Sequence, residues 1–218
     1  MALHLAIPLP KGAEYLASLA EEIGPKHGIS PYLILGICYA ESNFGLALKP
    51  PGPAGTGDFI ARVADKDTNE RMAKSPLPGV QKKHLAEGIK ARGIKTPVDA
   101  WVPTTTGWGM GLFQIDFESH FDFCKSGDWA DARKAMEYAC KLLAGNQKYL
   151  ASKAGLTGAT LVQATVGSYN AGAGRIAKFL AEKKDLDSAT FHPGYIKKIC
   201  DKADALAGHS GAYIFKAA

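Results

Sequence analysis

The chain has 218 residues, of which 46% are hydrophobic and 22% are charged, so it can bury a sizeable core like an ordinary globular protein. Its 26 Lys and Arg residues against 21 Asp and Glu residues give a formal net charge of +5, and no tight basic run contains aromatic residues. This mild charge favours anionic surroundings but is too small to identify them, and the absence of such a run argues against nucleic-acid binding. No segment is long enough for a membrane-spanning helix, and residues 1–10 lack the basic start of a signal peptide.

Two helices are expected in the first 45 residues. The amphipathic pattern of residues 13–28 predicts the first. The second is expected to start at Pro31, with Ser30 as its N-cap, and to end at Gly45. It is apolar on all sides, which is typical of a buried helix.

Glu41 is expected in the last turn of that apolar helix, where a carboxylate is costly. Loss of hydration and the negative end of the helix dipole would both raise its pKa. A carboxyl group that stays protonated near neutral pH can act as a general acid. The alternative is a Glu at a helix end whose charged group simply reaches solvent.

Residues 46–106 differ in character from the rest of the chain. They begin with a stretch rich in Pro and Gly and continue with weak helical patterns at 68–74 and 79–92. Such a length exceeds an ordinary connection between elements. We therefore expect one domain over residues 1–218 with an elaborated insertion at 46–106.

The remaining elements predict a mainly α chain with a small β element. Residues 107–116 alternate Gly with bulky side chains, which predicts a β-hairpin or tight bend whose glycines let a ligand approach the backbone. Asp128 is expected to cap the next helix. Helices are predicted at 129–153, 158–169, 173–184 and 193–206.

The four cysteines are Cys38, Cys124, Cys140 and Cys200, and their wide spacing has no zinc-site pattern. We expect free thiols, although two disulfides would also fit these positions. No motif indicates a metal, a nucleotide or a redox cofactor, so we expect no cofactor.

Three short motifs occur in order along the chain. They are Ala-Glu-Ser-Asn-Phe-Gly at 40–45, Gly-Met-Gly-Leu-Phe-Gln-Ile-Asp at 109–116 and Ser-Tyr-Asn-Ala-Gly-Ala-Gly at 168–174. Together they resemble the goose-type lysozymes and the related soluble lytic transglycosylases, over about residues 30–45 and 107–206. That family cleaves the β-1,4 bond between N-acetylmuramic acid and N-acetylglucosamine in peptidoglycan. The resemblance implies a lysozyme-like fold, a helical bundle with a small β-hairpin element and a substrate cleft.

The resemblance implies that Glu41 protonates the glycosidic oxygen as the general acid. Asp116, two positions after Gln114, matches an Asp of the goose-type enzymes that transglycosylases lack. An inverting hydrolase needs such a carboxylate to hold water on the opposite face of the sugar. The pattern therefore favours hydrolysis, with Asp116 as a catalytic residue. The alternative for Asp116 is a helix cap or turn residue.

One position departs from the family pattern. Goose-type enzymes carry another Asp four residues before the first Gly of Gly-x-Gly, and this position is Thr105 here. Asp99 is the nearest acid upstream. It would take over the catalytic role if its loop folded inward.

The resemblance also implies a set of sugar-binding residues. They are Ser42, Gln114, His120, Tyr169, Asn170 and Tyr195. Tyr169 would orient Glu41, Asn170 would bind acetamido and hydroxyl groups, and Tyr195 would open the last helix and face the acid. The alternatives are core packing for Tyr169 and an ordinary surface position for His120.

Three aromatic residues could stack on sugar rings or belong to the core; one lies in the insertion at 46–106 and two lie just after it. They are Trp101, Trp108 and Phe117.

We therefore expect an inverting peptidoglycan hydrolase, a bacteriolytic muramidase that acts on the cell wall as a monomer without membrane insertion. The absence of a clear signal peptide suits a phage lysin or an injected effector. Three alternatives stay open: a lytic transglycosylase with 1,6-anhydro products, a chitinase, and a sugar-binding module without catalysis.

Overall fold

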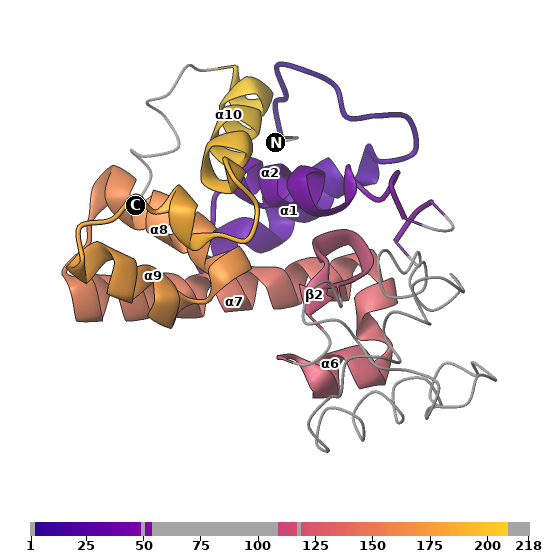
Figure 1. Ribbon diagram of the computed structural model, residues 1–218. Helices are drawn as coiled ribbons and strands as arrows, with labels where there is room; N and C mark the ends of the chain where they lie inside the picture. Colours follow the sequence, from indigo (N-terminus) through magenta and orange to yellow (C-terminus); the bar gives the residue numbers. More distant parts are fainter. Residues whose placement is uncertain (1–2, 49–50, 54–108, 117–118, 209–218) are drawn as a thin grey trace. The chain divides into compact units, whose positions relative to one another are not determined.

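Seven α-helices and a two-stranded antiparallel sheet form the described part of the computed structural model, which comprises residues 3–48, 51–53, 109–116 and 119–208 (Figure 1). The prediction of a mainly α chain with a small β element is confirmed. Most of the predicted insertion at 46–106, including both of its weak helical patterns, lies outside the described residues.

The chain divides into two compact units. Residues 1–44 and 136–218 form the first, which we call the helical unit, and residues 45–135 form the second, which we call the hairpin unit. The hairpin unit begins beside the predicted insertion but extends to Ala135, so it also contains the β-hairpin.

The helical unit contains the larger share of the described helices. They are α1 (Tyr15–Ile23), α2 (Pro31–Ser42), α8 (Gly158–Ala171), α9 (Ala173–Ala181), α10 (Tyr195–Ala207) and most of α7 (Ala132–Ala154), with 3-10 turns at Gly24–His27 and Asp187–Ala189. Helix α2 packs against α1 and α10, and α8 packs against α9 and α10 (Figure 1). A cluster of buried apolar residues joins α7, α8, α9 and the turn at 187–189. Its members are Leu150, Ala164, Ile176 and Ala189.

The described elements of the hairpin unit are short. They are β1 (Gly109–Met110), β2 (Ile115–Asp116), α6 (Phe121–Ser126) and 3-10 turns at Gly111–Phe113 and Asp128–Ala130. Gly109 pairs with Asp116 and Met110 with Ile115 in the antiparallel sheet, so the predicted hairpin is confirmed. Helix α6 was not predicted from the sequence, because six residues are too few for a clear helical period.

The apolar character of α2 has the expected consequence. Residues 33–38 are all buried, including Ile34, Leu35 and Ile37, which have no exposed surface. The helix ends at Ser42 and not at the predicted Gly45, because the next residue, Asn43, adopts the left-handed conformation (φ 49°) and its N–H donates to the carbonyls of Cys38 and Tyr39. Asn is one of the few residues besides Gly that tolerate this conformation.

Two further helix ends differ from the prediction. Asp131, not Asp128, caps α7: its Oδ1 accepts the N–H of Lys134 at 3.0 Å, while Asp128 opens a 3-10 turn. Helix α9 ends at Ala181 because Lys183 adopts a left-handed conformation (φ 54°) that closes the helix. A Lys at this position gives no sequence signal, since helices usually end with Gly there.

A glycine allows α2 and α10 to pack closely. A Cβ atom at Gly36 would lie 2.9 Å from the carbonyl oxygen of Ile199 and 3.3 Å from its Cγ2. Real Cβ atoms do not approach backbone oxygen so closely, so the two helices touch through this position. The contact matters for the site because α2 carries Glu41 and α10 carries Tyr195.

Replacement of Gly36 by Ala is expected to destabilise the protein by ~1–3 kcal/mol, since α10 must move away from α2 to admit the methyl group. The change in unfolding midpoint in urea measures this effect. Gly145→Ala is the matched control, because Gly145 lies in α7 with no atom within 4 Å of its Cβ position. Gly145→Ala should raise the free energy of unfolding by ~0.4–1 kcal/mol. Equal stability of the Gly36 variant and the wild type would contradict the close packing.

All four cysteines are free and buried. Burial raises the pKa of the Cys38 and Cys140 thiols to about 12 and that of Cys200 to about 11. These thiols therefore stay protonated at neutral pH and are core residues and not nucleophiles. Among the described residues, no helix has both the length and the apolar character that crossing a membrane requires.

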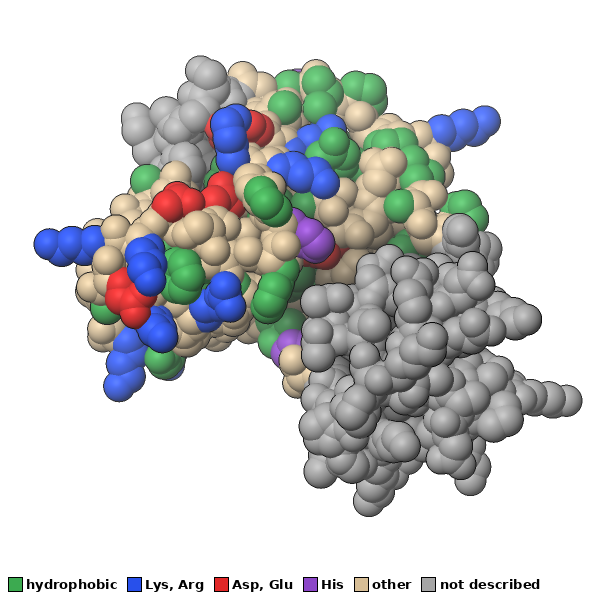
Figure 2. All heavy atoms as spheres, in the orientation of Figure 1, with side chains coloured by type: hydrophobic (Ala, Val, Ile, Leu, Met, Phe, Trp, Pro, Cys, Tyr) green, Lys and Arg blue, Asp and Glu red, His purple; other side chains and the backbone are tan. Residues whose placement is uncertain are grey.

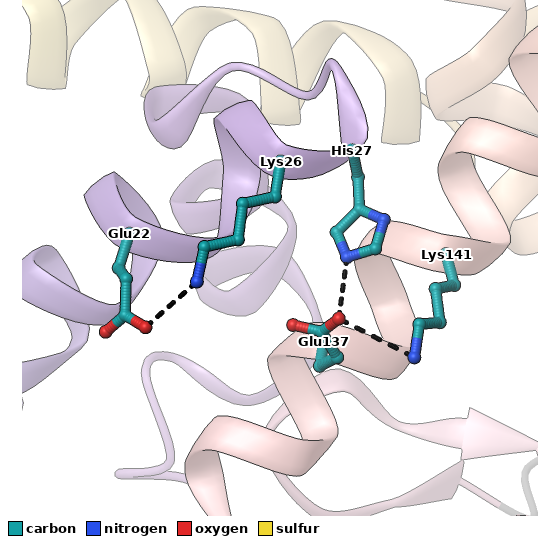
Figure 3. A network of polar contacts seen from close by, with 5 residues as sticks. All are labelled: Glu22, Lys26, His27, Glu137 and Lys141. Atoms are coloured by element: carbon teal, nitrogen blue, oxygen red, sulfur yellow. Dashed lines mark hydrogen bonds and ion pairs between the residues drawn. The ribbon is translucent and has the colours of Figure 1, made fainter.

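A polar network joins the turn after α1 to α7 (Figure 3). His27 Nε2 lies 2.8 Å from Glu137 Oε1, and Lys141 Nζ lies 3.6 Å from the same oxygen. The hydrogen bond with His27, and then the positive charge of its neighbours, lower the pKa of Glu137 from its usual 4.5.

Because the pKa of Glu137 is lower in the folded state, its stabilising effect is present above pH 4.5 and is lost as the pH falls below that value. Glu137→Gln is therefore expected to lower the free energy of unfolding by ~0.2–1 kcal/mol at pH 7, the usual range for solvent-screened pairs. The difference should narrow as the pH falls below 4.5. Denaturant unfolding of both proteins at several pH values measures this, and a difference independent of pH would contradict it.

Candidate active site

Glu41 occupies the last turn of α2, where the helix leaves the core. The residues just before this turn are buried, whereas Tyr39, Ala40 and Glu41 are partly exposed. Glu41 therefore lies where the apolar body of the helix ends and the chain becomes partly exposed.

Tyr195 is the direct partner of Glu41. It is the first residue of α10, it is 5% exposed, and its hydroxyl group donates a hydrogen bond to Glu41 Oε1. The two residues are 154 positions apart, and the packing of α10 on α2 brings them together. The contact fixes the direction of the Glu41 carboxyl group.

The start of α10 is itself held in place, which positions Tyr195. Gly194 precedes the helix in the left-handed conformation (φ 73°). Asp187 Oδ1 accepts the N–H of Ile196 at 2.7 Å, and His192 carbonyl oxygen accepts the N–H of Tyr195 at 3.1 Å. These bonds satisfy N–H groups that a helix start otherwise leaves without a partner.

The Tyr195 phenol is a permanent hydrogen-bond donor. Burial, then the negative charge of Glu41 and the hydrogen bond to it, raise the pKa of Tyr195 well above its usual 10, and Tyr169 adds a smaller effect. The phenol therefore keeps its proton throughout the pH range in which an enzyme works. The effect of Tyr169 also places that residue in the electrostatic surroundings of the Glu41–Tyr195 pair. Tyr169 is partly exposed, so it is not a fully packed core residue.

Two lysines of α10 surround the end of α2. Lys198 Nζ lies 3.5 Å from the carbonyl oxygen of Ala40 and 5.3 Å from the centre of the Tyr39 ring. Lys202 Nζ lies 4.5 Å from the Tyr39 ring and 5.7 Å from the Phe44 ring. Cations are favourable at a helix C-terminus and over aromatic faces. The two lysines therefore favour negative charge at this end of α2. Their effect is opposite to that of lost hydration and of the helix dipole, which both disfavour a charged carboxylate there.

Asn170 and Ser42 use their polar atoms within the protein. Asn170 Oδ1 accepts the N–H of Phe191 at 2.7 Å, so the oxygen of its side chain is engaged within the protein. The amide nitrogen is the group that can donate to a ligand. Ser42 is 2% exposed and its hydroxyl donates to the Cys38 carbonyl at 3.2 Å. This burial argues against the predicted contact between Ser42 and a sugar.

Gln114, in the hairpin unit, folds back over its own hairpin. Its Nε2 donates to the carbonyl of Gly111 at 2.8 Å, and a Cβ at Gly109 would lie 2.5 Å from its Oε1. A Cβ at Gly111 would likewise lie 2.5 Å from the carbonyl oxygen of Trp129. We predicted that these glycines admit a ligand, but they instead admit Gln114 and Trp129 of the same unit.

Asp116 and His120 flank the loop after β2. Asp116 Oδ1 accepts the N–H of Ser119 at 2.8 Å, the geometry of a turn residue. His120 precedes α6, and burial lowers its pKa while the negative charge of Asp116 opposes that change. His120 is therefore half-buried next to Asp116 and is not an ordinary surface histidine.

The other predicted residues lie outside the described part of the chain. These are Asp99, Thr105, Trp101, Trp108 and Phe117. The described residues thus bring Glu41, Tyr169 and Tyr195 together in the helical unit, and Gln114, Asp116 and His120 belong to the hairpin unit.

Three residues near the site, Lys198, Lys202 and Phe191, were not among the predicted site residues. Lys198 and Lys202 are four positions apart on α10, a spacing that places them on one helix face. Phe191 stands in a polar loop just before Tyr195, and an aromatic residue in such a loop can indicate a binding surface.

Within the described ranges, no group of three or more His, Cys, Asp or Glu residues is placed to hold a metal ion. Comparisons with family models, with curated proteins and with solved structures found no match to this chain.

Proposed function

We propose that this chain is a glycosidase of lysozyme-like fold that hydrolyses the β-1,4 bond between N-acetylmuramic acid and N-acetylglucosamine in peptidoglycan, with inversion. The hydrogen bond from the Tyr195 phenol to the Glu41 carboxyl group is the observation that carries the proposal. A sugar-binding module without catalysis has no need for an oriented carboxyl group at the end of an apolar helix.

In the proposed reaction, Glu41 gives its proton to the glycosidic oxygen while the bond to the sugar carbon breaks. The carboxyl group becomes negatively charged in this step. The Tyr195 donor and the nearby Lys198 stabilise that developing charge, so they assist the proton transfer itself.

Hydrolysis also needs a water molecule on the opposite face of the sugar, and we assign it to Asp116. One oxygen of this carboxylate accepts the N–H of Ser119, and among the described residues the other oxygen has no hydrogen bond and could hold the water. Asp99 is the second candidate for this role.

The turn at Asp116 favours one alternative, a lytic transglycosylase. In that reaction the 6-hydroxyl group of the muramic acid attacks its own ring carbon, so no carboxylate has to hold water. Glu41 and Tyr195 would keep the same roles. Because the nucleophile differs, the product carries a reducing end after hydrolysis and a 1,6-anhydro ring after transglycosylation.

The proposed partner is the glycan strand of the bacterial cell wall, and the protein acts there as a monomeric muramidase. The described part of the face in Figure 2 shows Lys and Arg scattered among Asp, Glu and hydrophobic side chains and not gathered in one basic area. Such a surface suits a wall polymer better than a nucleic-acid backbone.

The substrate class is tested with two insoluble polymers, purified peptidoglycan and chitin. We expect soluble saccharides to be released from peptidoglycan much faster than from chitin. Faster release from chitin would assign the protein to the chitinases. Release from neither polymer would overturn the proposed activity.

A further inference from the structure

Phe191 is an apolar residue that the fold holds out into solvent. It is 60% exposed, the largest value among the exposed large hydrophobic residues of the described ranges. The next values, 41% for Leu46 and for Tyr149, are clearly lower. A single exposed apolar side chain is ordinary on a protein surface, so the surroundings of Phe191 decide whether it serves a binding site.

The loop around Phe191 is rigidly built. The N–H of Phe191 donates to Asn170 Oδ1 at 2.7 Å. The hydroxyl group of the buried Thr190 lies 2.7 Å from the carbonyl oxygen of Asp187 and 2.8 Å from that of His192. The backbone is thus fixed on both sides of Phe191, and the exposed ring needs little ordering when a ligand binds.

One side of the ring is covered by a cation. The guanidinium carbon of Arg175 lies 5.5 Å from the centre of the Phe191 ring and 5.4 Å from that of Phe179. Arg175 is exposed, and no ion pair of its side chain occurs among the described residues. The arrangement leaves an aromatic surface with guanidinium N–H donors at its edge.

This surface and the proposed acid belong to the same unit and are linked through Tyr195. Phe191 precedes Tyr195, the partner of Glu41, by four residues, so their Cα atoms are at most about 14 Å apart. Asn170, which holds the Phe191 backbone, directly follows Tyr169. All of these residues belong to the helical unit.

We infer that Phe191, with Arg175 and Asn170, forms a sugar-binding subsite that stacks the ring of an N-acetylhexosamine close to the bond cleaved. This inference rests on the proposed function. A pyranose ring presents C–H groups on one face, and these are attracted to the negative face of an aromatic ring. The N–H groups of Arg175 and of the Asn170 amide supply donors for the hydroxyl and acetamido oxygens at the edge of the sugar.

The test measures binding in the Glu41→Gln variant, in which the ligand should remain uncut. Titration calorimetry with a soluble N-acetylglucosamine tetrasaccharide compares this parent with versions that also carry Phe191→Ala or Phe191→Trp. We expect Phe191→Ala to weaken binding about tenfold and Phe191→Trp to restore it, because Trp also offers a flat aromatic face. Tyr149→Ala, on the exposed part of α7, is the matched control and should bind like the parent.

Unchanged affinity in Phe191→Ala, or no binding by the parent, would overturn the subsite. Equal weakening in Tyr149→Ala would also overturn it, because the loss would not be specific to Phe191. The proposed function fails in a different way: a wild-type protein that binds the tetrasaccharide through Phe191 but does not cleave peptidoglycan would overturn the activity and leave the subsite standing. Thermal melting of each variant shows that the fold is retained.

Discussion

Replacement of Glu41 by Gln is expected to lower the rate of peptidoglycan cleavage by a factor of about 10²–10⁴, the usual contribution of a general acid. Gln has nearly the same shape and can still accept the hydrogen bond from Tyr195. It cannot donate a proton with the acidity that the glycosidic oxygen needs. The initial rate of turbidity loss of a peptidoglycan suspension measures the effect.

The control for this substitution is Glu182→Gln. Glu182 follows α9 and pairs on the surface with Lys184 at 2.7 Å, so the same chemical change there should leave the rate unaltered. Circular dichroism and thermal melting of the Glu41→Gln protein should match the wild type. Full activity in the Glu41→Gln variant would remove Glu41 from the mechanism.

Replacement of Tyr195 by Phe is expected to lower the maximal rate by about tenfold, because a hydrogen bond to a charged group contributes about 1.5–3 kcal/mol and water recovers part of it. The variant should also show a shifted pH profile. The Tyr195 donor stabilises the ionised carboxylate of Glu41, so its loss lets the acid keep its proton to higher pH. The alkaline limb of the rate profile should therefore move upward by about one pH unit.

The direction in which the alkaline limb moves shows whether Tyr195 positions Glu41 or only stabilises the fold. The Tyr195 phenol does not itself titrate within the profile, because burial and Glu41 hold its pKa well above 10. A loss of stability alone would reduce the rate at every pH without moving the limb. Tyr149→Phe is the control, since Tyr149 lies on the surface of α7. An unshifted limb in the Tyr195 variant would contradict its contact with the catalytic acid.

Much of the fold could be predicted from the sequence because its strongest patterns are local. The continuous apolar run after Pro31 predicts a buried helix, and the alternating glycines before Asp116 predict a hairpin. The helix ends were harder to predict. Asn43 and Lys183 adopt left-handed conformations that Gly would usually mark, and packing of the surrounding chain decides such positions.

The candidate site was predictable in part. The resemblance placed Tyr195 opposite Glu41, and no local pattern could have shown a contact across 154 positions. The sequence also could not show that Ser42, Gln114 and Asp116 bond to their own backbone. Polar side chains at the ends of elements commonly do so: Ser42 and Gln114 use a donor group in this way, whereas Asp116 uses one oxygen of its carboxylate.

Mass spectrometry of the soluble products from purified peptidoglycan tests the central claim most directly, because the mass identifies both the bond cleaved and the form of the new end. We expect disaccharide peptides that end in reducing N-acetylmuramic acid, and we expect the Glu41→Gln protein to release almost none of them. Products with 1,6-anhydro ends would contradict hydrolysis, and glycan strands that remain intact would contradict glycosidic cleavage by this protein.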